Sequence, residues 1–232
     1  MCEDRYEIIN ANQDRRHERS WDFSSAGSFC TTYESMEQAS LASGDFRNAI
    51  SPRDYEYEKF WGAVYRELVS SNKSKLNFLV DSLQNLAAES DLSQTDLSQL
   101  VVSFVQDIPY SYVLARECSA EETAKHPCLG NERLGILSPY EFIHSLYGDC
   151  DTRAVLIYTI LEELGFDPMI VISKEYSHAM LAINMPAIGD HLTFNGKNYY
   201  FWETTGKGWP VGVLPPSSKN VNYWKIALVN EL

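Results

Sequence analysis

Cys150 stands where a thiol can act as a nucleophile. Gly148 ends one predicted helix, and Cys150 follows it at the start of a strongly apolar helix that runs to Leu164. The first turn of a helix presents unpaired backbone N–H groups and the positive end of the helix dipole, and both favour the thiolate that attacks carbonyl carbons. Cys150 is therefore the candidate nucleophile. The alternative is a small packing residue at a helix start.

A nucleophilic cysteine needs a base and a group that orients the base. His178 opens a predicted strand after the Cys150 helix, and Glu203 lies near the end of a later strand. In this order the imidazole would take the thiol proton, and the carboxylate would orient the imidazole and stabilise its charge. Each residue also has a structural interpretation, as a core histidine and as the cross-strand partner of a lysine. Their order and context together indicate a catalytic triad.

The sequence leaves the roles of several residues near this triad undecided. Asp149 and Asp151 flank Cys150 and oppose thiolate formation, so they would instead cap the helix or bind a cationic group of a substrate. The backbone N–H of Cys150 is a candidate to hold an oxyanion. Gln106 and Tyr110 precede a long connection and could approach the oxyanion or the substrate, with packing as the favoured role.

Helices are expected in the first part of the chain to support this site. Residues 1–20 are polar and are expected to form a flexible lead or an extended arm, followed by short strands over 20–35 and a short helix over 36–49. Apolar residues at helical spacing then predict three helices, one from Ser51, one over 76–86 and one over 95–108. The connection over 110–137 is either a lid or a surface insertion, and the box Ser138-Pro139-Tyr140-Glu141 begins a short helix that ends at Gly148.

The last third of the chain has strand patterns. Strands are expected over 169–173, 178–184, 191–194, 197–204 and 224–229, with Asn195-Gly196 as a hairpin turn and 206–216 as a loop. The fold class is therefore α+β, with the central cysteine-bearing helix packed on an antiparallel sheet and an N-terminal helical layer. We expect an N-terminal extension over 1–50 and a catalytic domain over 51–232.

Composition excludes several classes of partner. The 232 residues carry a net charge of −13, whereas nucleic acids and anionic membranes are bound by clustered lysine and arginine. No apolar run is long enough for a transmembrane helix, and the polar start is unlike a signal peptide. Cys2 is either incidental or the lipid-modified first residue of a mature lipoprotein. Cys118 and Cys128 could form a disulfide in an oxidising compartment, and no metal or cofactor pattern is present.

The segment from Ser138 to Thr205, about a third of the chain, resembles the transglutaminase-like superfamily of papain-like cysteine enzymes, in its bacterial form. The resemblance rests on the helix-start box, on Gly148-Asp149-Cys150-Asp151 with its apolar helix and Leu164-Gly165, on His178-Ala179, and on Tyr200-Phe201-Trp202-Glu203-Thr204-Thr205. It implies that Cys150 attacks a carboxamide or peptide carbonyl, His178 acts as base and Glu203 orients it. The superfamily more often has aspartate at the third position, and glutamate is one methylene longer.

The expected function is a cysteine-dependent enzyme that acts on amide or peptide bonds through a thioester. Hydrolysis by a protease or amidase is favoured over transfer to an amine, because the chain lacks the Asp-rich loops of a calcium site. We expect a protein or peptide substrate, which could come from the cell envelope. We expect an exported location, periplasmic or lipid-anchored through Cys2, rather than a cytoplasmic one. The alternatives are an inactive binding or scaffold module and a redox protein using Cys118 and Cys128.

Overall fold

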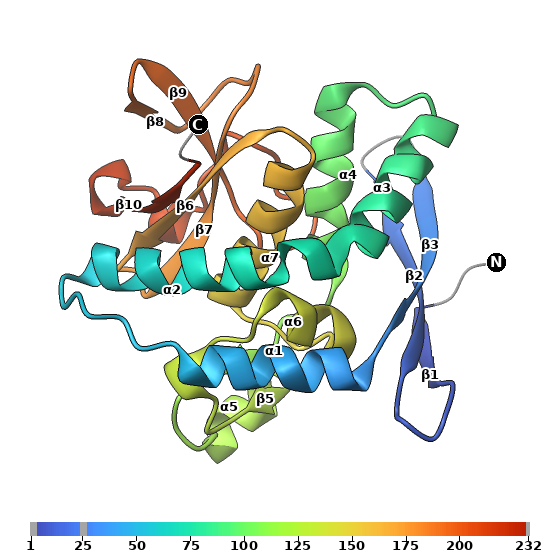
Figure 1. Cartoon of the computed structure of the whole chain (residues 1–232). Helices are drawn as coiled ribbons and strands as arrows, with labels where there is room; N and C mark the ends of the chain where they lie inside the picture. Colours follow the sequence, from blue (N-terminus) through green and yellow to red (C-terminus); the bar gives the residue numbers. More distant parts are fainter. Residues whose placement is uncertain (1–3, 24–26, 231–232) are drawn as a thin grey trace.

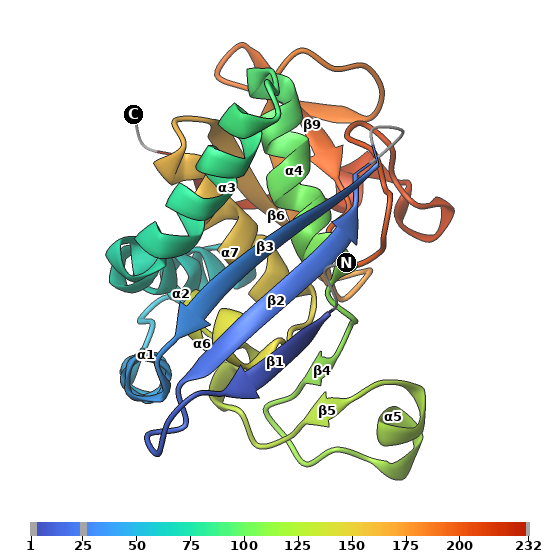
Figure 2. The same cartoon turned by 90° about the vertical axis from the view of Figure 1, so that its right-hand side faces the viewer.

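The N-terminal segment forms a three-stranded antiparallel sheet. In the computed structural model, which describes residues 4–23 and 27–230, the strands are β1 (Arg5–Ile8), β2 (Arg15–Asp22) and β3 (Ser28–Ser35), in that order across the sheet. The expectation of a flexible lead over 1–20 is therefore wrong for β1 and β2. The reason is a period-two pattern in β2, which buries His17, Arg19 and Trp21 against the helices behind the sheet (Figure 2). Cys2 lies outside the described residues.

Four helices follow, the short one expected over 36–49 and the three that the apolar spacing predicted. Their bounds are α1 (Glu37–Ala49), α2 (Tyr57–Asn72), α3 (Asn77–Glu89) and α4 (Gln94–Asp107), with a 3₁₀ turn η2 at Lys73–Leu76. The predicted start at Ser51 is wrong, because α2 begins at Tyr57. The Asp54 carboxylate accepts the backbone N–H of Glu56 at 3.0 Å, and this turn delays the helix. Trp21 and Tyr33 of the N-terminal sheet share one hydrophobic core with these helices.

The cysteine-bearing helix α7 (Cys150–Glu163) lies between this helical layer and a second sheet (Figure 1). The sheet is antiparallel, in the order β10-β6-β7-β9-β8. Its strands are β6 (Asp167–Ser173), β7 (His178–Asn184), β8 (His191–Phe194), β9 (Lys197–Trp202) and β10 (Lys225–Val229). Helix α7 is buried on all sides through Leu161 and packs on β6 and β7. The predicted α+β class, with this helix on an antiparallel sheet, is confirmed.

Strand β10 departs from simple alternation. A bulge lies between Ile226 and Leu228, so Leu228 packs into the core around α7, whereas Ile226 packs on the opposite face of the sheet. That opposite face has its own smaller apolar cluster, which includes Phe201, Leu214 and Trp224. The sheet is thus buried on both faces in its centre, as the apolar run of β6 predicted.

Helix α6 (Pro139–Ser145) leads directly into the Cys150 segment. The predicted capping box is present, with the Ser138 hydroxyl accepting the Glu141 N–H at 3.3 Å. The helix ends earlier than predicted, at Ser145, with Leu146 in the left-handed conformation at φ 61°. Gly148 is needed for packing instead, because a Cβ at this position would lie 2.7 Å from the Phe142 ring.

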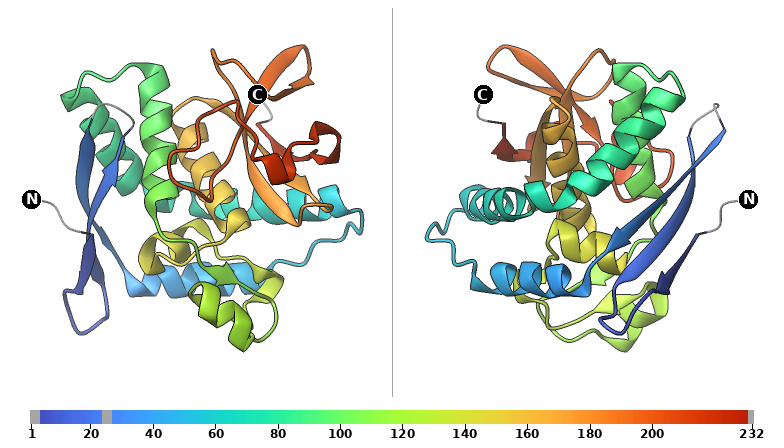
Figure 3. Two further views of the ribbon diagram at one scale, coloured as in Figure 1. Left: turned by 180° about the vertical axis from the view of Figure 1, so that it is seen from behind. Right: turned by 45° about the vertical axis from the view of Figure 1, so that its right-hand side comes forward.

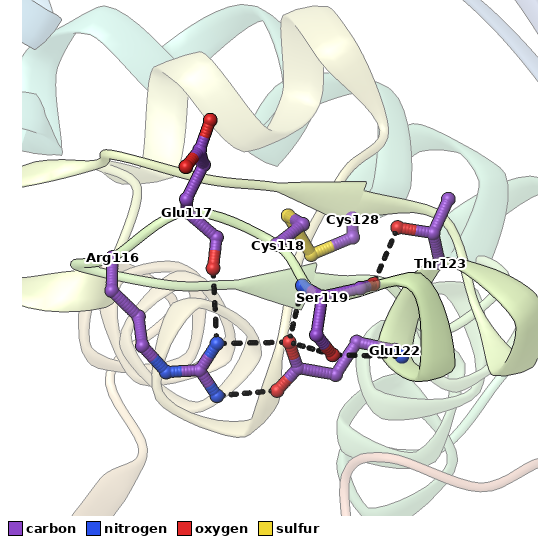
Figure 4. The surroundings of a disulfide bond; sticks show 7 residues. All are labelled: Arg116, Glu117, Cys118, Ser119, Glu122, Thr123 and Cys128. Carbon is purple, nitrogen blue, oxygen red and sulfur yellow. Dashed lines mark hydrogen bonds and ion pairs between the residues drawn. A yellow bond between two sulfur atoms is a disulfide. The ribbon is translucent and has the colours of Figure 1, made fainter.

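The connection over 110–137 is an ordered, disulfide-linked lobe. It contains β4 (Tyr112–Val113), α5 (Ala120–Lys125), β5 (Cys128–Leu129) and a 3₁₀ turn η3 (Arg133–Gly135). Cys118 and Cys128 are bonded, and beside them the Arg116 guanidinium pairs with both oxygens of Glu122 (Figure 4). The sequence left this bridge open, and the structure shows it. Strand β4 pairs with β5 in parallel.

Two buried histidines form a relay that fastens the N-terminal sheet to α6. His144 Nε2 lies 2.6 Å from Glu37 Oε2, His144 Nδ1 lies 2.8 Å from Ser35 Oγ, and that hydroxyl lies 3.0 Å from His17 Nε2. One proton order satisfies all three contacts: His17 donates to Ser35, Ser35 to His144 and His144 to the carboxylate. Both imidazoles are then neutral, and burial lowers the pKa of His17 to about 3.

We expect acid to unfold this region through His17. In the unfolded chain His17 titrates near 6.5, whereas in the fold it stays neutral down to about 3, so stability is complete above pH 6.5 and declines as the pH falls between these values. At about pH 4.5, two units below the unfolded value, the loss is expected to be about 3 kcal/mol. The free energy of unfolding, measured with urea at a series of pH values, tests this. His17→Gln keeps a donor to Ser35 and should make the free energy less dependent on pH. His191→Gln, on exposed β8, should leave the pH dependence unchanged. Equal slopes in all three proteins would contradict the expectation.

Candidate active site

The segment before Cys150 is held in place by a buried arginine. Arg153 is fully buried and donates to the carbonyl of Gly148 at 3.1 Å and to that of Val105 at 2.8 Å. It also bonds the carbonyls of Ile108 and Pro109 at the end of α4. One side chain thereby donates to four carbonyls, three at the end of α4 and one before Cys150, and it fixes the start of α7 against α4.

Cys150 begins α7, as predicted, and is a free thiol. The preceding Asp149 is the N-cap and accepts the Thr152 N–H at 3.1 Å. The thiol is buried, with 7% of the residue exposed. The backbone N–H of Ala179 lies close enough to the sulfur to favour the thiolate, and this residue directly follows His178. The packing of α7 on β7 therefore brings Cys150 and His178 together.

His178 is oriented by Glu203. Its Nε2 lies 2.9 Å from Glu203 Oε2, and its side chain is 19% exposed. Since Nε2 is occupied by the carboxylate, Nδ1 is the nitrogen left to exchange a proton with a thiol or a substrate. The edge of the Trp224 ring faces the imidazole, with centroids 5.8 Å apart, and limits its rotation.

Glu203 follows β9 directly and is held by a dense set of donors. Its second oxygen, Oε1, accepts from the backbone N–H groups of Thr204 and Thr205 and from the Thr205 hydroxyl, at 2.9, 2.9 and 2.7 Å. Burial opposes ionisation of the carboxyl, but the hydrogen bonds from His178 and Thr205 outweigh it and hold the pKa of Glu203 below its usual value. The longer glutamate side chain thus reaches the imidazole from a strand end, with its charge intact.

Gln106 supports this strand end and does not face an oxyanion. Its Nε2 donates to the carbonyl of Glu203 at 2.7 Å and to that of Trp209 at 3.0 Å, so both N–H donors are used. The weaker interpretation of Gln106, a substrate or oxyanion contact, therefore does not hold, and the residue has the structural role that was favoured. Tyr110 stays close to the thiol: burial and then the charge of Cys150 raise its pKa. The Arg153 guanidinium lies 5.7 Å from the Tyr110 ring.

Two carboxyl groups lie beside the Cys150 thiol and affect its pKa. Burial first, and then the charges of Asp151 and Asp149, raise the pKa of Cys150 well above its usual value. Asp151 Oδ2 lies 3.4 Å from the Cys150 sulfur, and its other oxygen accepts the Tyr65 hydroxyl. Tyr65 is fully buried on α2. The thiol is therefore protonated at rest and needs a base at the moment of attack.

Removing the Asp151 charge is expected to make Cys150 more reactive. In Asp151→Asn the amide oxygen still accepts from Tyr65, while its N–H₂ donates to the sulfur and favours the thiolate. We expect alkylation by iodoacetamide at pH 7 to be about ten-fold faster, and its pH profile to move to lower pH. Mass spectrometry of quenched samples measures the rate, with Asp81→Asn on the exposed face of α3 as the control. A slower or unchanged rate would refute this role of Asp151.

A pocket opens beside the histidine. It has a volume of about 370 Å³ and is lined by His178, Glu203, Thr205, Tyr176 and Trp209 together with the turn at residues 215–218. The loop after β9 runs beside α4, where Gln106 bonds it (Figure 3), and its residues Thr205 and Trp209 line the pocket. A substrate in this pocket would lie next to the imidazole.

Several residues of the site escaped prediction. Tyr65 lies on an apolar helical stripe and Trp224 at the start of a strand, which are patterns typical of packing, and Arg153 has no partner pattern in the sequence. Thr205 lies within the segment that carries the superfamily resemblance, but its hydroxyl had no assigned role. Only the fold shows that these side chains converge on the triad.

Comparisons with known proteins do not assign a function to this site. No family model, curated protein or solved structure matches the chain. Among the described residues, no three His, Cys, Asp or Glu side chains gather as a metal site would require. Within the same residues, no helix has the length and apolar character needed to cross a bilayer.

Proposed function

We propose that the protein is a cysteine-dependent enzyme with a transglutaminase-like core, acting on amide or peptide bonds through a thioester. The observation that carries this proposal is the hydrogen bond between His178 Nε2 and Glu203, formed beside a free thiol at a helix start. A histidine held at one nitrogen by a buried, ionised carboxylate is arranged to act as a base through the other.

The reaction follows from the protonation states. As the Cys150 sulfur attacks the carbonyl carbon, its proton passes to His178 Nδ1, and Glu203 stabilises the imidazolium. The carbonyl oxygen becomes an oxyanion, for which the backbone N–H of Cys150 at the helix start is a donor. The imidazolium then protonates the leaving amine as the C–N bond breaks, which leaves a thioester on the sulfur.

The thioester needs an acceptor. A water molecule deprotonated by His178 gives a carboxylic acid and restores the thiol, whereas an amine gives a new amide. We favour hydrolysis, because the sequence lacks the Asp-rich loops of a calcium site. The disulfide Cys118–Cys128 supports an exported location, since such bonds persist in oxidising compartments.

One observation favours the alternative, an inactive module that binds but does not react. The thiol is 7% exposed and lies beside two carboxyl groups that oppose its ionisation. An inactive module would show no dependence of Cys150 chemistry on His178.

Trapping tests both. Wild type and Cys150→Ala are incubated with a cell-envelope extract, quenched in acid and analysed by mass spectrometry. The enzyme should carry acyl groups on Cys150 that hydroxylamine removes, and Cys150→Ala should retain uncleaved ligand without an adduct. Retained ligand in both proteins and no adduct in wild type would favour the binding module.

A further inference from the structure

A second pocket lies on the other side of the loop that carries Glu203. It also has a volume of about 370 Å³, and it is bounded by the C-terminal half of α4, the end of β2 and residues 207–211. Its wall is mainly apolar and aromatic, from Phe23, Trp202, Trp209, Pro210 and Val211. Such a volume and lining suit a single ring or a branched apolar group.

Three charged groups at this pocket pair with one another. Lys207 Nζ lies 2.5 Å from Asp107 Oδ1, and Asp107 Oδ2 lies 3.4 Å from a guanidinium nitrogen of Arg19. Gln99 and Ser103 line the same wall from α4. Asp22 adds an exposed carboxylate where β2 ends at the pocket, so the preference for an apolar group comes from the aromatic wall, with polar contacts at its edge.

Trp209 forms a wall common to both pockets. Its carbonyl accepts from Gln106 and, at 2.9 Å, from the Trp202 indole N–H, and its ring lies over Gly206, where a Cβ would be 2.9 Å from the indole. The apolar pocket and the His178 pocket are thus neighbours across one side chain. A polypeptide whose side chain filled the first would pass its backbone along Trp209 toward the second.

We propose that this pocket binds an aromatic or large branched apolar side chain of the polypeptide on which Cys150 acts. The assignment rests on the proposed function for the identity of the substrate, while the pocket and its chemistry stand on the geometry alone. A small side chain would leave the aromatic wall unfilled, and a charged side chain would lose its water against that wall.

Tryptophan fluorescence tests the pocket. N-acetyl-4-nitro-L-phenylalaninamide carries a ring that quenches indoles, and it should quench wild type with a saturable curve because Trp202 and Trp209 line the pocket. Gln99→Phe, which fills the pocket from α4, should weaken half-saturation about ten-fold or more. Gln94→Phe, at the exposed start of the same helix, should leave it unchanged. Linear quenching in wild type, or the same half-saturation in Gln99→Phe, would overturn the proposal.

Protection of Cys150 tests whether the occupant belongs to the substrate. The nitrophenylalanine probe should slow iodoacetamide alkylation of Cys150 in wild type, N-acetyl-L-alaninamide should not, and Gln99→Phe should abolish the protection. Saturable quenching without protection would overturn the assignment to the substrate while leaving the proposed function intact. Failure of the proposed function has a different signature, a Cys150 reactivity that is the same in wild type and His178→Ala.

Discussion

Replacing His178 with alanine is expected to slow acylation of Cys150 by p-nitrophenyl acetate by about 10²- to 10⁴-fold. Burial and the two neighbouring carboxyl groups raise the pKa of this thiol, so little thiolate forms without help. The imidazole must therefore accept the proton during attack, and alanine removes the acceptor. Release of p-nitrophenolate under single-turnover conditions measures the step.

His191→Ala is the matched control for this experiment. His191 lies on exposed β8 of the same sheet. Among the described residues, the hydrogen bond of its side chain is to the nearby carbonyl of Gly189, at 3.0 Å. Its acylation rate should equal that of wild type. If His178→Ala also reacted at the wild-type rate, the histidine would have no role as base.

Replacing Glu203 with glutamine is expected to slow the same acylation by about 10³- to 10⁴-fold, although only one atom changes. The three donors around Oε1 favour the amide oxygen at that position, so the N–H₂ group faces His178 Nε2. His178 then accepts at Nε2 and carries its proton on Nδ1. In this tautomer Nδ1 cannot take the thiol proton.

Glu203→Asp distinguishes this account from a loss of structure. Aspartate keeps the charge and the tautomer but is shorter, so we expect an intermediate rate and recovery relative to glutamine. Circular dichroism and urea unfolding check that each variant is folded. A Glu203→Gln protein that is folded and acylates as fast as wild type would exclude the carboxylate from the mechanism.

The sequence predicts the three residues of the proposed triad because the signals for each of them are local. Cys150 follows a glycine and begins an apolar helix, and His178 opens a strand whose bounds, His178–Asn184, match the prediction. The hairpin turn at Asn195-Gly196 set the register that carries Glu203 to the strand end. Each of these features depends on residues close together in the chain.

The remaining parts depend on contacts between distant segments. The polar residues 1–20 looked unstructured because the partners of His17 and Arg19 stand on β3, α4 and α6, far along the chain. Gln106 carries an amide that could contact a substrate. In the fold, however, both of its N–H groups donate to carbonyls of the Glu203 loop. The role of Asp151 likewise became defined only when α2 brought Tyr65 to it.

The most direct test of the central claim is the site of acylation. Wild type is mixed with p-nitrophenyl acetate, quenched in acid within the first turnover and mapped by peptide mass spectrometry. We predict one acetyl group on the peptide that contains Cys150, removed by hydroxylamine and absent from Cys150→Ala and His178→Ala. Acetylation confined to lysines or the N-terminus, with equal p-nitrophenolate release from wild type and Cys150→Ala, would contradict a nucleophilic Cys150.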